Sequence, residues 1–305
     1  MLAGRVGTAR AGILTIIDEE FDAVRSALGG PGQVVEVADS GYYSPDPVTC
    51  NVVLAQSIDR SNIPASNAAS NMLEDFRPEV LIVCGIAGAF EGRDLDLGHV
   101  LVADYLHYCE FWKLTEGGDF RRYLPIEQPS PSLRAGHARP LARDFDLEGR
   151  IQVTPPQLAP GQRWPPRVRE GSIVAGEKVM GNPKHQTQRD VAAHYDNAQA
   201  VDMESVGVAS ALAGERKRVD YNPRLVVIRG VSDIIRVIDP NAPETDEQRQ
   251  QAKQENDAQR QSWKRYSAAG AAVFCCALVE RLLRQPDLRR AVRAPRNAVK
   301  SPKSP

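Results

Sequence analysis

Three groups of carboxylates stand where this chain could carry out acid–base chemistry. The segment AVDMESVGVASAL, at 200–212, places Asp202 and Glu204 at the start of a run of small and apolar residues. A carboxylate buried in such a run loses hydration unless hydrogen bonds or charges replace the water. Asp202 fits a helix cap, which is a common role for an acid near a first turn. Glu204 has no basic partner nearby in sequence, so a ligand-binding role and a structural role stay equally open for it.

Acids also follow two other apolar segments. Asp18, Glu19 and Glu20 follow AGILTII, and Asp233 lies near the end of VVIRGVSDI. Parallel strands place ligands at their carboxyl ends, so acids that follow separate strands can meet in one site. Taken singly, a helix cap or a surface charge explains Asp18 and Glu19 better. Spacing alone therefore suggests a site without specifying its reaction.

The elements that must position these acids alternate along the chain. Helical patterns cover 18–28, the second half of 61–76, and a final segment that places Trp263 and Leu282 on one face. This alternation predicts a sheet with helices on its faces and shows no break for a second domain. Apolar runs bounded by turn residues predict strands at 11–17, 48–56, 80–90, 98–106, 171–176 and 225–229.

Three segments differ from this pattern. Residues 115–168 contain many prolines and arginines, which predicts a long excursion with one short helix near 133–145. Residues 241–262 contain no large apolar side chain and are expected to form a solvated helix or a mobile lid. We therefore expect an N-terminal tail at 1–10, one domain at 11–286 and a basic disordered tail at 287–305.

The composition limits the class of protein. The 305 residues are 42% hydrophobic and 25% charged with a net charge of -1, which is ordinary for a soluble globular protein. No apolar run reaches the ~20 residues needed to span a membrane. The five cysteines and five histidines show neither a disulfide framework nor a metal-binding spacing, which favours a reducing cytoplasm and no metal. A net charge near zero does not favour nucleic-acid binding, for which the basic tail is the one candidate.

The turn GIAGAFEG, at 85–92, contains three glycines that would let a ligand approach the backbone. It matches neither GxGxxG nor GxxxxGK[ST], so it indicates no dinucleotide site and no classical triphosphate loop.

Several motifs in order carry a family resemblance: GIAGAF, GHVLVAD, GSIVAGEKVM, AVDMES, VVIRGVSD and WKRYSAAGAAVF. Together they resemble the nucleoside phosphorylase and nucleosidase superfamily over about 11–283. The chain is most similar to methylthioadenosine/S-adenosylhomocysteine nucleosidases and to nucleosidase domains of bacterial effectors. The resemblance implies a single three-layer α/β/α domain with a partly closed mixed sheet, no cofactor, and a homo-oligomer, either a dimer or a hexamer.

The resemblance also implies roles for the acids. Glu204 would bind the ribose hydroxyls with Met203 against the sugar, and Glu20 would hold the attacking water. Asp233 would protonate or hydrogen-bond N7 of a departing purine. The further substrate-binding residues that the resemblance implies are Ser232 and Arg229 in support of Asp233, Val179 and Met180 at the base, and Gly85, Ile86, Ala87 and Gly88 in the glycine turn. Ile86 departs from the small hydroxyl residue that many nucleosidases carry there.

These roles agree with the chemistry of an N-glycosidic bond. Its cleavage builds positive charge on the ribose and negative charge on the base, so a site needs anions at the sugar and a proton donor at the base. We therefore expect a purine nucleosidase that hydrolyses a nucleoside or nucleotide to free base and ribose or ribose phosphate. The alternatives are a phosphate-dependent phosphorylase and a non-catalytic nucleotide-sensing module. The loop TIIDEEF is acidic where phosphorylases bind phosphate, which favours hydrolysis.

One further hypothesis concerns the 5′ group of the substrate. Lys113, Arg121 and Arg122 lie near the aromatic residues Tyr108 and Phe111, in a pattern that resembles the effector-type branch. They could pair with 5′ phosphates of a nucleotide such as AMP or ATP. The alternative, that they are ordinary solvated cations, carries equal weight.

Overall fold

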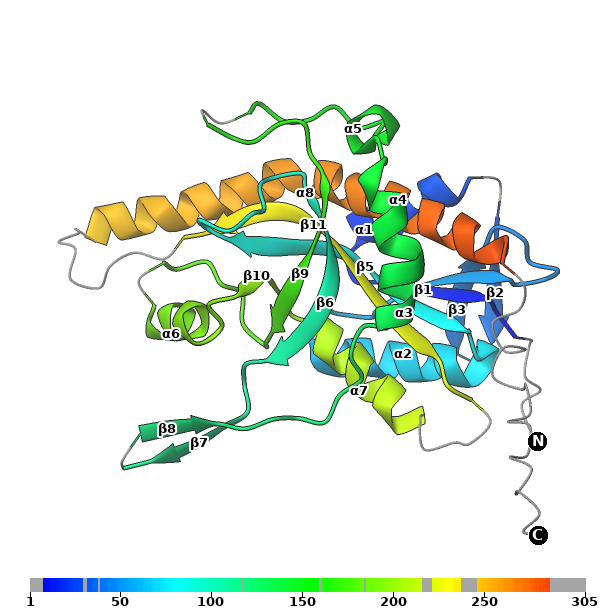
Figure 1. The fold of residues 1–305 in the computed structure, drawn as a ribbon, viewed down its shortest axis with the longest axis horizontal. Helices are drawn as coiled ribbons and strands as arrows, with labels where there is room; N and C mark the ends of the chain where they lie inside the picture. Colours follow the sequence, from blue (N-terminus) through cyan, green and yellow to red (C-terminus); the bar gives the residue numbers. More distant parts are fainter. Residues whose placement is uncertain are drawn as a thin grey trace, which may run out of the picture.

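A central mixed sheet organises the part of the chain that the computed structural model describes, namely residues 8–29, 32–37, 39–116, 118–158, 161–183, 185–215, 221–236 and 246–285 (Figure 1). An inner strand, β1 (Ala11–Thr15), runs parallel to β4 (Val52–Gln56) on one side and to β5 (Val80–Phe90) on the other. All five residues of β1 are buried because helices cover both faces of the sheet.

The sheet curls back on itself at one end. β10 (Ala198–Asp202) pairs with β9 in parallel and with β5 antiparallel, so that it touches strands on both sides of a small closed section. This partly closed mixed sheet confirms the fold class expected from the sequence. The strand order is β10, β9 (Val168–Ala175), β6 (Val100–Tyr108), β11 (Arg224–Ile235), β5, β1, β4, β3 (Ser40–Ser44) and β2 (Gln33–Val37).

Helices form the two outer layers. The helices α1 (Asp18–Leu28) and α8 (Asp246–Leu283) pack together on one face, and α2 (Asn62–Phe76) and α7 (Ser205–Glu215) pack together on the other (Figure 1). Contact between β11 and α8 depends on Gly230, because a Cβ built there would lie 2.0 Å from the carbonyl oxygen of Ser267. The remaining elements are β7 (Trp112–Thr115), β8 (Gly118–Arg121), α3 (Pro131–Leu133), a π-helical turn at Arg134–Ala138, α4 (Arg139–Arg143), α5 (Leu147–Arg150) and α6 (Gln186–His194).

Most expected elements are confirmed, among them one short helical segment near 133–145, where α3, the π-helical turn and α4 follow one another without a break. The strand expected at 225–229 is longer and continues to residue 235. The expectation missed the antiparallel pair β2–β3 and the hairpin β7–β8. Residues 246–262 belong to α8, which selects the helix from the two alternatives for this part of 241–262, whereas 241–245 lie outside the described residues. Residues 1–7 and 286–305 also lie outside them, and with them most of the expected N-terminal tail and all of the expected C-terminal tail.

Length and composition alone would allow the segment Gln254–Leu283 of α8 to cross a membrane. In the fold, however, 67% of the most apolar stretch of this segment is buried inside the protein, where α8 packs against β11 and α1. This segment is therefore a core helix of the domain.

Candidate active site

Asp233 is aimed into a pocket by an irregularity in β11. The pairing of β11 with β5 shifts register between Val231 and Asp233, so Ser232 is an extra residue in the ladder. Such bulges redirect side chains and are frequent beside active sites. The Asp233 side chain is only 1% exposed, and its Oδ1 accepts a hydrogen bond of 2.7 Å from Ser232 Oγ. The expected support of Asp233 by Ser232 is thus present.

Arg260 of α8 makes the second contact with Asp233. Its Nε donates to Oδ1 at 3.2 Å and its Nη2 donates to Oδ2 at 3.1 Å, which is a two-point contact of guanidinium with carboxylate. The family resemblance had implied Arg229 in this supporting role. That assignment is wrong, because Arg229 contacts a different pair of acids.

Glu20 joins two loops of the site. It is the third residue of α1, and its Oε2 accepts hydrogen bonds from the backbone amides of Ile16, at 2.7 Å, and Ile17, at 3.2 Å. Its Oε1 accepts from the amide of Ile86 at 2.8 Å. Ile86 lies within β5, so the turn expected at 85–92 is wrong over 85–90, where pairing with β11 keeps the chain extended. Burial raises the pKa of Glu20, and the charge of Arg229 and the three amides offset only part of this effect.

Arg229 lies fully buried beneath the acids. Its Nη2 is 2.7 Å from Asp202 Oδ2 and 3.4 Å from Glu204 Oε2, and Asp202 also accepts from the amide of Ser205 as a helix cap. Burial alone would lower the pKa of Arg229, but Asp202, Glu204 and Glu20 together raise it above its ordinary value. A cation fixed here compensates the carboxylates that the apolar segment 200–212 buries.

Glu204 combines burial with nearby like charges. The pKa of Glu204 is raised to about 7, mainly by burial. The charge of Arg229 acts to lower this pKa, and the charges of Asp202 and Glu20 act to raise it. Its Oε1 accepts a hydrogen bond of 3.4 Å from the amide of Ser61 at the start of α2. Glu204 therefore titrates near neutral pH while it faces the same pocket as Asp233.

Gly85 makes room for this arrangement. A Cβ built at Gly85 would lie 2.4 Å from Glu20 Oε1 and 2.5 Å from Arg229 Nη1. Any side chain there would separate the acid from the cation, so this position of β5 has a structural reason to be glycine.

One pocket of about 320 Å³ collects most of the expected site residues, and its volume suits a small organic ligand. Gly85 and Arg229 lie below it and outside its lining. The expected residues that line it are Glu20, Ile86, Ala87, Gly88, Val179, Met180, Met203, Glu204, Ser232 and Asp233.

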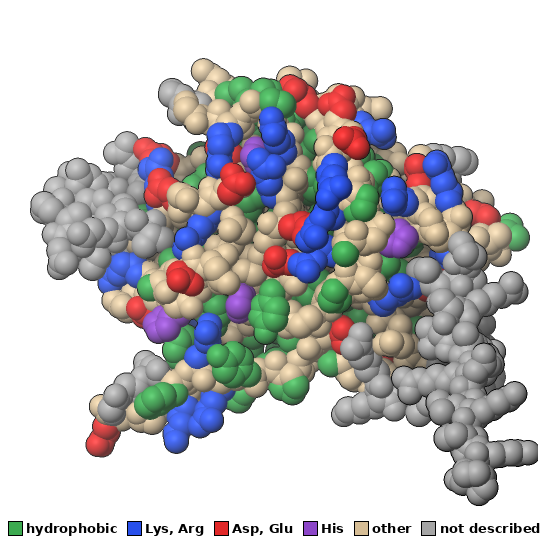
Figure 2. All heavy atoms as spheres, in the orientation of Figure 1, with side chains coloured by type: hydrophobic (Ala, Val, Ile, Leu, Met, Phe, Trp, Pro, Cys, Tyr) green, Lys and Arg blue, Asp and Glu red, His purple; other side chains and the backbone are tan. Residues whose placement is uncertain are grey.

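Lys113, Arg121 and Arg122 lie elsewhere in this chain. Lys113 and Arg121 belong to the hairpin β7–β8, Arg122 directly follows it, and the hairpin projects from the sheet (Figure 1). In Figure 2, hydrophobic and basic side chains lie together on this projection. The Arg121 guanidinium stacks over the ring of Tyr195 at 4.3 Å. None of the three cations lines the pocket, so the chain by itself does not bring them to a substrate there.

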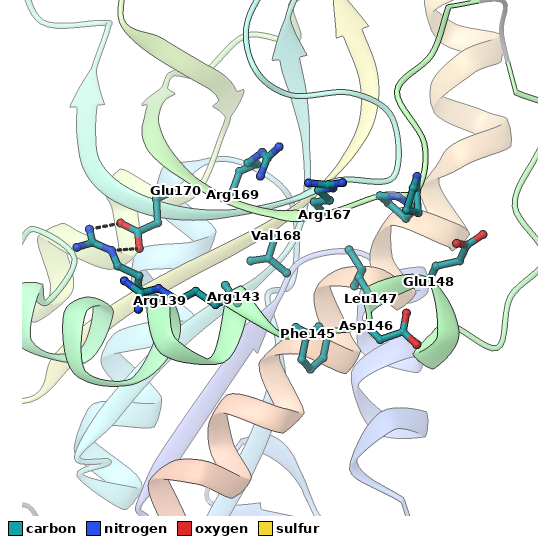
Figure 3. A pocket seen from close by; sticks show the side chains of 13 residues that line it. Arg139, Arg143, Phe145, Asp146, Leu147, Glu148, Arg167, Val168, Arg169 and Glu170 are labelled. Carbon is teal, nitrogen blue, oxygen red and sulfur yellow. Dashed lines mark hydrogen bonds and ion pairs between the residues drawn. The ribbon is translucent and has the colours of Figure 1, made fainter.

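A larger cavity, of about 470 Å³, lies between α4, α5 and the start of β9 (Figure 3). Four arginines line it, but Arg139 is held by Glu170 through two hydrogen bonds of 2.7 and 2.6 Å. Arg167 and Arg169 extend to the side of the strand opposite Val168, as alternation along a strand requires. Its charged groups therefore do not converge on one point, and the smaller pocket is the better candidate for chemistry.

Sequence reasoning missed several residues that line the smaller pocket, among them Arg60, Lys178, Arg260 and Lys264. Helical spacing could have indicated Arg260, since it lies three residues before Trp263 and shares the inward face of α8. Among the described residues, no group of three or more His, Cys, Asp or Glu side chains could hold a metal ion.

The sequence of the chain is similar to those of known proteins. Residues 10–267 match the phosphorylase superfamily. A 5′-methylthioadenosine/S-adenosylhomocysteine nucleosidase from Staphylococcus aureus is 24% identical over 223 residues, which cover 73% of this chain and 86% of that protein.

Solved structures show the same fold. The nucleosidase of this kind from Neisseria meningitidis, in complex with methylthio-immucillin-A, has a TM-score of 0.64 at 18% identity and covers 89% of this chain and 98% of its own. The futalosine hydrolase of Helicobacter pylori has a TM-score of 0.62 at 18% identity, covering 90% and 98%. The corresponding nucleosidase of Colwellia psychrerythraea, solved with adenine, has a TM-score of 0.65 at 19% identity, covering 90% and 96%. The chain belongs to the phosphorylase superfamily.

Proposed function

We propose that this protein is a purine nucleosidase that hydrolyses the N-glycosidic bond of a purine nucleoside or nucleotide. The observation that carries the proposal is that three buried carboxylates from separate parts of the chain, Glu20, Glu204 and Asp233, line one pocket. Relatives in sequence and in fold are named as nucleosidases, and a further relative in fold is a hydrolase of futalosine.

The arrangement matches the charges that develop during the reaction. Glu204 and Glu20, when ionised, stabilise the positive charge that builds on the ribose. Glu20 also accepts the proton of the attacking water, because its carboxylate is fixed by three backbone amides. Asp233 lines the same pocket and assists the departure of the base by hydrogen bonding, as the family resemblance implies.

Hydrolysis is favoured over phosphorolysis by the position of Glu20. Its carboxylate already accepts hydrogen bonds from the amides of Ile16 and Ile17 after β1 and of Ile86 in β5, so these donors are not free for an anion. A phosphate ion placed here would lose those donors and meet a carboxylate at short range.

The test is release of free base. Purified protein is incubated with guanosine, inosine, adenosine, methylthioadenosine and the 5′-monophosphates, with and without phosphate. We expect base release without phosphate, and a loss of about 10²- to 10⁴-fold in rate for Asp233→Asn. Asp22→Asn is the matched control, because Asp22 lies on α1 with an exposed side chain paired to Arg25.

Release that requires phosphate would replace the nucleosidase by a phosphorylase. Saturable binding of a nucleoside with no base release from any substrate would replace it by a sensing module.

A further inference from the structure

Both carboxylate oxygens of Asp233 already accept hydrogen bonds from protein side chains. Oδ1 accepts from Ser232 and Arg260, and Oδ2 accepts from Arg260. The hydrogen-bond donors that this end of the pocket can still offer to a base therefore include those of Arg260.

Arg260 has donors to spare. A guanidinium carries five N–H groups, and among the described residues only Asp233 accepts hydrogen bonds from Arg260. Its side chain is 32% exposed and lines the pocket together with Gly88, Ser232 and Asp233. Burial acts to lower the pKa of Arg260, but the hydrogen bonds and charge of Asp233 outweigh it and keep the group cationic.

A cationic fork of donors discriminates between purines. Guanine and hypoxanthine present two acceptors side by side, O6 and N7, which a guanidinium binds with two hydrogen bonds. Adenine presents an amino group at position 6, whose N–H donors would face those of Arg260. Negative charge on a departing 6-oxopurine also spreads onto O6, where a cation stabilises it.

We propose that Arg260 selects a 6-oxopurine base, so that guanosine- or inosine-type compounds are the substrates. This inference rests on the proposed nucleosidase function and names its substrate class. It sets the protein apart from the structural relative that was solved with adenine.

The experiment compares kcat/KM for inosine, guanosine and adenosine in the wild type and in Arg260→Gln. We expect the wild type to prefer the 6-oxopurines by about 10- to 100-fold. Arg260→Gln should lose that preference and gain relative activity on adenosine, because a carboxamide pairs with N6 and N7 of adenine. Arg236→Gln is the matched control, since Arg236 is an exposed arginine near the same end of β11 that does not line the pocket.

Two outcomes would overturn the inference. One is a wild type that hydrolyses adenosine as well as it hydrolyses inosine. The other is an equal loss on all three substrates in Arg260→Gln, which would mean that Arg260 only positions Asp233.

Binding of free hypoxanthine and adenine, measured by calorimetry on both proteins, separates this inference from the proposed function. If no base is released from any substrate, the nucleosidase proposal fails, while tighter binding of hypoxanthine that is lost in Arg260→Gln still supports the selection. Adenine bound as tightly as hypoxanthine by the wild type would contradict it, even if Arg260→Gln failed to fold.

Discussion

At the scale of single residues, Arg229 explains how an apolar segment tolerates its acids. Its fully buried side chain contacts Asp202 and Glu204, and Glu20 adds a further negative charge nearby. Removal of one partner from a buried ion pair leaves an uncompensated charge, which is far more costly than loss of a surface pair.

Arg229→Met is therefore expected to destabilise the fold by about 3–5 kcal/mol, measured by urea unfolding. Arg284→Met is the matched control, because Arg284 is exposed and paired only with Glu280 one helical turn away among the described residues, and its loss should cost less than about 1 kcal/mol. Equal effects of the two substitutions would show that Arg229 does not compensate the buried acids.

The fall in rate at acid pH is expected to reflect protonation of Glu204. Because Glu204 must be ionised to stabilise a cationic ribose, and its pKa is raised to about 7, kcat/KM should fall as the pH drops below about 7. The measurement is kcat/KM between pH 5 and 9, and a rate that stays level down to pH 5 would remove Glu204 from this role.

At the scale of elements, substitutions in and beside the hairpin β7–β8 test whether this hairpin binds the 5′ group of the substrate. Since Lys113 and Arg122 do not line the pocket, Lys113→Ala and Arg122→Ala should change kcat/KM by no more than roughly twofold for a nucleoside and for its 5′-monophosphate. Arg60→Ala provides the comparison, because Arg60 does line the pocket.

A loss confined to the 5′-monophosphate in the hairpin variants would contradict that expectation. It would mean that the hairpin of one copy reaches the pocket of another copy of the chain.

The elements also show what the sequence could and could not reveal. Strands buried on both faces, such as β5, are continuous apolar runs and were predicted. The edge strand β2 is mostly exposed, and β3, with the sequence SGYYS, has no continuous apolar run, so neither was predicted. The three acids were predicted because each ends or follows an apolar run. Arg260 was not, because its contact with Asp233 joins residues 27 positions apart and depends on how α8 packs on β11.

At the scale of the whole molecule, the site lowers the stability of the fold that holds it. Glu20 and Glu204 both have pKa values raised mainly by burial, so their charged forms are less favourable in the folded protein than in the unfolded chain. For a group of this kind, the stabilising contribution is fully present below the unfolded pKa of about 4.5 and is lost as the pH rises through the folded value, which for Glu204 is about 7.

Glu204→Gln should therefore gain stability relative to the wild type as the pH rises from about 4.5 to about 7, by an amount on the order of a few kcal/mol. Glutamine has nearly the same shape but no charge to desolvate, so the gain reflects ionisation alone. Chemical unfolding at pH 5 and pH 8 measures the difference. Glu19→Gln is the control, because the hydrogen bond with Lys264 is the main cause that lowers the pKa of Glu19. The contribution of Glu19 to stability therefore changes with pH in the opposite sense. If the free energies of unfolding of Glu204→Gln and the wild type differ by the same amount at both pH values, ionisation of the buried acid does not destabilise the fold. A gain at pH 8 together with lost activity would show that the pocket keeps its charge at the expense of the fold.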